Sequence, residues 1–416
     1  MTLGAHAERL IYRIAGLPVA VSALWASTEG DPSEALLSAF VWRYWHPQGA
    51  GEWSELVGGL MTWPIAVLGG VLWYTWRNGA VVRGRTGKPI RAQLADQLKL
   101  YFSSGLLAPW YYIFSLYDGD SSRRAKAYLY RFETKPSIFL LLKRRKGSPL
   151  TDKGAFAEYC AARGIRCIPT LLILDGKPPH RPLPEEDLFV KPSHGRGGTG
   201  AERWDRGDRG SYTAPSGERL TPDHLLERLV RRSRRYPLIV QPRLPIHPEL
   251  ADLTAGALPT MRVVTCLNEL GTGELVGAVF RMSIGANRTV DNLHAGGIAA
   301  AVDLASGRLS RATNLGADAR LGWLSSHPDT DARIEGRALP LWEDAKRLAI
   351  EAHRHFGDRV VVGWDIAILE DGPIIVEGNG NPDMDILQRF MRDGLRQHRF
   401  AELLAFHLRE RMPALA

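Results

Sequence analysis

Two short apolar runs near the C-terminal end of the chain constrain its fold most strongly, because each carries side chains with hard oxygen atoms. The first run carries Asp365, and the second carries Glu377 and Asn379. Between them stands Glu370-Asp371-Gly372-Pro373, a sequence typical of a turn. The pattern predicts an antiparallel hairpin in which Glu377 and Asn379, two residues apart, project from the same face of one strand.

The chemistry of these side chains predicts the ion that they bind. Two carboxylates and an amide oxygen, with no Cys or His nearby, suit Mg²⁺ held jointly with the phosphate groups of a substrate. The hairpin therefore predicts a magnesium site at Asp365, Glu377 and Asn379, and with it nucleotide chemistry.

A glycine-rich segment follows the predicted strand 188–191 and precedes another at 201–204. Four glycines within six residues favour a mobile flap whose backbone amides can approach phosphates closely. It is not a Walker A loop, because no Gly-Lys-Ser/Thr sequence ends it. Lys191, on the strand that enters the flap, is expected to direct its ammonium at the phosphates. The flap residues expected at the nucleotide are Ser193, His194, Gly195, Gly197, Gly198 and Thr199; simple exposure to solvent is an equal alternative for His194.

Two arginines, Arg262 and Arg281, lie in the middle of apolar predicted strands. A buried guanidinium requires an anionic partner, so we expect both to bind phosphate or a substrate carboxylate; a structural salt bridge to a neighbouring carboxylate is the alternative. His294, in the segment 291–297, is a candidate base for an incoming amine, with a structural hydrogen bond as its alternative.

Composition limits the partners and the compartment. The net charge of +8 and the pI of about 9.4 favour an anionic partner, which could be a nucleotide, an anionic lipid or nucleic acid. Nucleic acid is the weakest of these, since no basic strand interleaved with aromatic residues or zinc-finger spacing occurs. Three cysteines without paired spacing predict a reducing, cytoplasmic compartment.

The first 135 residues are predicted to be mainly helical and rich in aromatic side chains, and the aromatic cluster at 110–117 is expected to pack in a core. Within this region, residues 56–76 carry no charge and are followed by basic residues. A membrane span, a contact with the inner face of the membrane and a buried helix all remain open for this segment.

From residue 136 onward, strand pairs and helices come in blocks rather than in strict alternation, which predicts an α+β fold. Thr151 is the expected N-cap of the first helix. The remaining expected strands are 167–174, 238–241, 260–267, 274–282, 297–304 and 309–313, and the expected helices are 151–164, 223–235 and 340–356, with two more after the hairpin.

Together these features resemble the ATP-grasp superfamily over residues 136–395. The finer motifs resemble its sugar-transfer-associated branch, which is related to alpha-L-glutamate ligases. They are Gln241-Pro242 with His247-Pro248, the strand 260–265, the segment 290–297 and Gly363-Trp364-Asp365. The resemblance implies two α+β lobes that clamp ATP, the first at 136–240 with the flap and the second at 241–395 with the hairpin. The helical region 1–135 precedes them and a C-terminal helix, 396–416, follows.

The resemblance also implies roles for further residues. The hinge, with Gln241, Arg243 and Leu244, would meet the adenine edge, Glu249 would bind the ribose, and Lys153 would be a second nucleotide-side lysine. The implied activity is an ATP- and Mg²⁺-dependent carboxylate–amine ligase that acts through an acyl phosphate, with a small carboxylate and an amine as substrates. The branch name implies a link to cell-surface polysaccharide or secondary-metabolite assembly. A kinase acting on a hydroxyl group and a non-catalytic nucleotide-binding scaffold are the alternatives.

Overall fold

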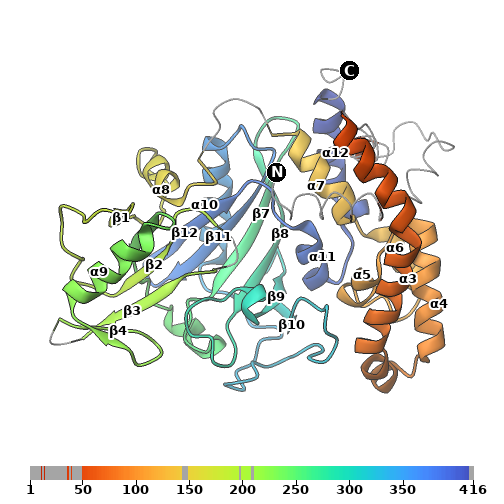
Figure 1. Ribbon diagram of the computed structural model, residues 1–416, viewed down its shortest axis with the longest axis horizontal. Helices are drawn as coiled ribbons and strands as arrows, with labels where there is room; N and C mark the ends of the chain where they lie inside the picture. Colours follow the sequence, from red (N-terminus) through yellow and green to blue (C-terminus); the bar gives the residue numbers. More distant parts are fainter. Residues whose placement is uncertain are drawn as a thin grey trace.

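The computed structural model of the chain describes Ile11, Ile14, Ala35, Leu36, Ala39 and residues 49–142, 149–195, 198–207 and 210–411. Within these residues, strand pairing defines two six-stranded sheets whose neighbouring strands are all antiparallel (Figure 1). The prediction of an α+β fold is confirmed. Gly197, which was expected to contact the nucleotide, lies outside the described residues.

The first sheet carries the glycine-rich flap. Its strands, in spatial order, are β1 (Leu172–Leu174), β6 (Leu238–Pro242), β2 (Leu188–Pro192), β3 (Glu202–Arg206), β4 (Tyr212–Thr213) and β5 (Arg219–Leu220). Helix α9 (Pro222–Ser233) packs its apolar stripe, Leu225, Leu229 and Val230, into the core of this sheet. Because β2 and β3 are paired, the glycine-rich segment between them projects from one end of the sheet.

The second sheet carries the predicted metal hairpin. Its strands, in spatial order, are β10 (Leu309–Thr313), β9 (Ile298–Val302), β8 (Gly273–Met282), β7 (Thr260–Leu267), β11 (Val361–Leu369) and β12 (Gly372–Asn379). Every residue of β11 is buried, because β7 and β12 flank it and helices cover the sheet. The expected hairpin is therefore present.

One face of the second sheet is mainly apolar. Met261, Val263 and Trp364 point to this face. Against it packs α10 (Trp342–His355), whose buried Ala345, Ala349 and Ala352 allow the helix to approach the strands closely. Phe156 and Cys160 of α8 (Lys153–Ala161) join the same core.

The other face is divided into two halves. Val264, Val279 and Ala299 form an apolar half, onto which α7 (Arg131–Leu140), α11 (Met384–Met391) and α12 (Arg399–Arg411) pack. Further along the same strands, the alternation places polar side chains instead, namely Thr260, Arg262, Arg281, Asp365 and Glu377.

Four helices of the N-terminal region pack side by side at one end of the long axis of the molecule (Figure 1). They are α3 (Ala50–Thr86), α4 (Ile90–Ser104), α5 (Ala108–Ile113) and α6 (Ser121–Ala127). The expected aromatic core is confirmed, since Tyr111, Tyr112, Phe114, Tyr128 and Tyr130 are all buried in one cluster. Among the described helices, α3 is long and apolar enough to cross a membrane by length and composition, a test that core helices also pass.

Local differences from the sequence predictions have simple causes. The N-cap of α8 is Asp152 rather than Thr151, because the Asp152 carboxylate accepts bonds from the amides of Gly154 and Ala155. The strand expected at 167–174 shortens to β1, with an isolated bridge between Cys167 and Ile375. Strands β4 and β5 were not predicted, since each contains only two residues. Three short 3₁₀ helices, η1 (Pro248–Leu253), η2 (Leu293–Ala295) and η3 (Leu395–Gln397), occupy loops.

A buried ionic cluster fastens α7 to the loop that follows β12. The ammonium of Lys135 lies 2.6 Å from Oδ1 of Asp383 and 2.8 Å from the carbonyl oxygen of Asn381. Arg131 contacts Asp383 at 2.9 Å and Asp385 at 3.2 Å. Burial lowers the pKa of Lys135, and Asp383 opposes that shift. Helix α7 therefore fixes the chain just beyond the predicted metal ligands.

We predict that Lys135→Met destabilises the protein by about 1–3 kcal/mol, because it leaves a partly buried carboxylate with only one cationic partner. Urea unfolding monitored by circular dichroism measures this. Arg399→Met, which removes surface ion pairs to Glu269, Glu274 and Glu402, should cost much less, because solvent screens these charges. Equal losses in the two variants would contradict a special role for the buried cluster.

The second prediction concerns His353, which is fully buried on α10 and bonded through Nε2 to the carbonyl of Arg359. Burial lowers its pKa from 6.5 to about 4. Since the unfolded chain then binds a proton that the folded chain does not, stability falls as the pH drops from 6.5 to 4, by up to about 3 kcal/mol. His353→Gln should flatten this part of the pH profile of the unfolding free energy, whereas His355→Gln, at an exposed position, should leave it unchanged.

Candidate functional site

Asp365 and Glu377 stand directly opposite each other on β11 and β12. On the same two strands, Trp364 and Gly378 face the apolar core, and a Cβ on Gly378 would lie 2.6 Å from Leu150. Glu377 and Asn379 therefore share the polar face, as the alternation predicts. Gly363 lies opposite Asn379 and accepts a 3.5 Å hydrogen bond from its side-chain amide.

Both predicted arginines contact the carboxylate of Asp365. Arg262, its partner in the β7–β11 register, binds it with two nitrogens at 2.5 and 3.1 Å, and Arg281 reaches it at 3.2 Å. A Cβ on Gly363 would lie 3.1 Å from Cδ of Arg262, so glycine leaves room for this side chain. Burial alone would raise the pKa of Asp365, but the two guanidinium groups hold it well below its usual range.

Asp291 completes this buried charge cluster; the sequence singled out its segment, 290–297, but not this residue. Its carboxylate lies 3.4 Å from Nε of Arg281 and accepts bonds from the amide and hydroxyl of Thr260. Burial raises the pKa of Asp291, against the influence of Arg281 and Thr260. Burial also opposes the charge on Arg281, yet Asp291 and Asp365 raise its pKa above the ordinary value.

The predicted ligands supply only part of the coordination shell of Mg²⁺. Across the described residues, no group of three or more His, Cys, Asp or Glu side chains is placed to hold a metal ion. Asp365, Glu377 and Asn379 supply two carboxylates and one amide, which matches the preference of Mg²⁺ for few protein ligands with water and phosphate oxygens completing its shell. The residues therefore fit a cation that arrives with a phosphorylated ligand.

Two lysines from the first sheet and α8 approach this group. Nζ of Lys153, at the start of α8, lies 3.9 Å from Glu377 and donates to the carbonyl of Gly195 at 3.1 Å. Lys191 on β2 is buried, and burial lowers its pKa while nearby Glu377 opposes that shift. Its ammonium forms no hydrogen bond or ion pair with any residue that the structure describes.

The flap is anchored at its start and meets the second lobe at its tip. Ser193 is buried, and its hydroxyl is 2.8 Å from Nδ1 of the mostly exposed His194. Gly198 has a φ of +70°, and a Cβ there would lie 3.1 Å from Val290. Gly195 also has a positive φ, while Thr199 is exposed.

The hinge offers one free acceptor. Gln241 is buried, and its Oε1 has no hydrogen-bond partner in the described part of the chain. Arg243 is engaged by Asp187 at 2.5 Å and Asp205 at 3.1 Å, and Leu244 packs beside the β11–β12 core.

Two predicted residues stand apart from the charge cluster. His294, on η2, and Glu249, on η1, are exposed. The backbone amide of His294 is bonded to Asn292, and the backbone carbonyl of Glu249 accepts from Arg337. Among the described residues, neither side chain makes an ion pair with the cluster.

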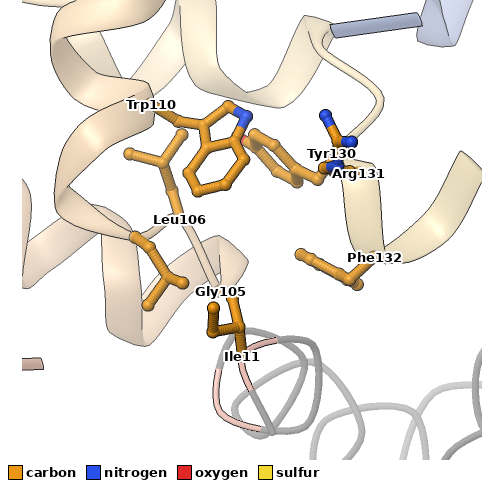
Figure 2. Close-up of a pocket in the computed structure, with 8 residues that line it drawn as sticks. Ile11, Gly105, Leu106, Trp110, Tyr130, Arg131 and Phe132 are labelled. Carbon is orange, nitrogen blue, oxygen red and sulfur yellow. The ribbon is translucent and has the colours of Figure 1, made fainter. Parts of the chain in front are cut away.

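A separate hollow in the N-terminal region differs in chemistry from this site (Figure 2). It encloses about 270 Å³ of space that is partly open to solvent. Of its eight lining residues only Arg131 is charged, and the ring systems of Trp110, Tyr130 and Phe132 form much of its wall. A polyanion would find one cation there, whereas the site formed by the second sheet, α8 and β2 offers four: Lys153, Lys191, Arg262 and Arg281.

Comparisons with solved structures give distant likenesses. The D-alanyl-alanine synthetase A of Vibrio cholerae is 14% identical with a TM-score of 0.37, and the match covers 64% of this chain and 66% of that one. A D-alanine–D-alanine ligase from Bacillus anthracis is 13% identical with a TM-score of 0.35, and the match covers 64% of this chain and 69% of that one. An L-amino acid ligase from Bacillus licheniformis is 12% identical with a TM-score of 0.34, and the match covers 66% of this chain and 53% of that one. The chain thus spans two thirds or less of the length of the first and third of these proteins. No curated protein matches it.

The family comparison is more extensive. The model of the sugar-transfer associated ATP-grasp family matches residues 140–402, which include both sheets, the flap, the hinge and the β11–β12 hairpin. This match covers well over half of the 416 residues. The chain therefore belongs to the sugar-transfer associated ATP-grasp family.

Proposed function

We propose that the protein is an ATP-dependent carboxylate–amine ligase. The observation that carries the proposal is the largely buried side chain of Lys191, whose ammonium lies over the ring of Phe189 and has no anionic partner among the described residues. Burying an uncompensated cation is costly. The phosphates of ATP, with about four negative charges, would supply the missing partner.

The proposed binding roles follow from position. Lys153, Lys191 and the amides of the flap would hold the phosphates, and the unpaired Oε1 of Gln241 is an acceptor available to the base. Asp365, Glu377 and Asn379 would hold Mg²⁺, which would neutralise charge on the phosphates. Glu249 for the ribose and His294 as a base remain proposals that depend on movement of η1 and η2.

The chemistry proceeds in two balanced steps. An oxygen of the substrate carboxylate attacks the γ-phosphorus of ATP, the bond to the β-phosphate oxygen breaks, and ADP leaves. The nitrogen of an amine then attacks the carbonyl carbon of the acyl phosphate, phosphate departs with the former carboxylate oxygen, and the nitrogen loses a proton. Arg262 and Arg281 would stabilise the negative charge on the transferred group. The flap would exclude water, which hydrolyses acyl phosphates.

The finer assignment concerns the product. We propose amide formation on a small carboxylate for cell-surface polysaccharide or secondary-metabolite assembly, with the family description as its support. The first lobe, 136–240, would contribute the flap and the second, 241–395, the metal ligands.

We predict that Lys191→Met and Glu377→Gln each lower the rate of ADP release per enzyme by about 10²–10³-fold. The first removes a cation that would contact the reacting phosphate, and the second removes a ligand of the Mg²⁺ that would neutralise it. Coupled detection of ADP, with carboxylate and amine panels, measures the rate. Lys99→Met, at an exposed position on α4, is the matched control and should retain full activity. Wild-type rates in both site variants would refute the site.

The route is tested separately with a carboxylate labelled with ¹⁸O. A ligase that uses an acyl phosphate transfers one labelled oxygen to the released phosphate, which mass spectrometry detects. A phosphorylated hydroxyl product formed without an amine would identify a kinase. ATP binding without turnover on any carboxylate and amine would identify a scaffold.

A further inference from the structure

The outer face of α3 is a continuous apolar stripe. Nine of the fifteen exposed large hydrophobic side chains among the described residues lie on this one helix. They are Trp53, Val57, Leu60, Met61, Ile65, Leu68, Leu72, Trp73 and Trp76, and their exposed fractions run from 41% to 77%. Their spacing of three or four residues places them along one side of the helix, over roughly 35 Å.

The opposite side of α3 is occupied by protein. Val67 and Val71 are buried in a cluster with Tyr101 of α4 and Ala108 of α5. Thr75 accepts a 2.7 Å hydrogen bond from the buried Gln97, so polar groups are also matched across this contact. The helix is therefore apolar on both sides, and among the described residues only one side has a partner.

This packing argues against a simple membrane span. A span would surround α3 with lipid, but α4 lies against its inner side and carries charged Arg91, Asp96 and Lys99. Carrying these charges into the hydrocarbon would be unfavourable. The exposed stripe can instead lie parallel to a surface, with α4 and α5 above it.

The charge pattern identifies the surface. From residue 77 to residue 91 the chain contains five basic residues and no acidic residue. Arg77 and Lys88 form ion pairs with Asp318 and Asp96, whereas Arg83 and Arg91 are exposed. Arg83 is exposed two turns after Trp76 on the same side of the helix. A cationic end next to an apolar stripe with three tryptophans complements the headgroups and upper acyl chains of anionic phospholipids.

We propose that the outer face of α3 binds in the plane of a bilayer that contains anionic phospholipid. Figure 1 places α3 and α4 at one end of the long axis and the first sheet with α9 at the other. The membrane contact therefore leaves both sheets, and the charge cluster, accessible to soluble substrates. It does not depend on the reaction that the cluster performs.

The test uses the full chain and flotation with vesicles of phosphatidylcholine alone or mixed with phosphatidylglycerol. The protein should float with the mixed vesicles and remain largely unbound with the neutral ones. Ile65→Glu, at a side chain 77% exposed, should lower the bound fraction at least tenfold. Leu270→Glu makes the same chemical change at a side chain 89% exposed on the β7–β8 turn and should bind as the wild type does. Arg83→Gln should weaken binding to the mixed vesicles alone.

Three outcomes would overturn the proposal. The first is absence of binding to mixed vesicles, or binding that Ile65→Glu and Leu270→Glu affect equally. The second is resistance to extraction by alkaline carbonate, which would identify a span. The third is a wild-type dimer in sedimentation velocity that Ile65→Glu dissociates, which would show that a second copy covers the stripe. Both glutamate variants are on the surface, and circular dichroism confirms their folding.

Discussion

The ion pairs of Asp365 determine how the polar half of the second sheet is built. Asp365 is buried beside β7 and β12, and an isolated carboxylate there would be strongly unfavourable. Arg262 and Arg281 compensate its charge, and Asp291 and Thr260 in turn satisfy Arg281. These groups come from three strands and one loop, so the ionic network fixes the positions of β7, β8, β11 and the segment before η2 together.

The same pairing determines what the site can bind. Four cationic side chains, Lys153, Lys191, Arg262 and Arg281, face three carboxylates, those of Asp291, Asp365 and Glu377, which leaves an excess of one positive charge in a largely buried place. A divalent cation at Asp365 would compete with its arginines, and phosphate groups could become the new partners of those arginines. Binding of the cation and binding of the phosphate would then favour each other. The cation takes the place of the arginines at Asp365, and the phosphate takes the place of Asp365 at the arginines.

The features of the structure that depend on local sequence pattern could be predicted from the sequence. Strict alternation and a turn sequence were enough to place Asp365, Glu377 and Asn379 on one face, and they fixed most strand boundaries as well. Asp152, rather than Thr151, caps α8, because two adjacent residues had suitable side chains and only backbone geometry chooses between them. The contact of Lys135 with Asn381 spans 246 residues, and no local pattern records such a partner. For the same reason, the sequence could not show that Arg262 and Arg281 pair with Asp365.

The helices before residue 140 belong physically to the body that carries the site, although the family match begins only there. Arg389 on α11 is buried, donates to the carbonyl of Ile113 and to Oγ of Ser115, and stacks on Trp323. Burial lowers its pKa to about 10, and neutral oxygens rather than a carboxylate satisfy it. Together with the α7 cluster, this joins the N-terminal helices to the second sheet at two points. A surface bound by α3 would therefore hold the polar half of that sheet at a fixed distance, because these buried contacts join the N-terminal helices to it.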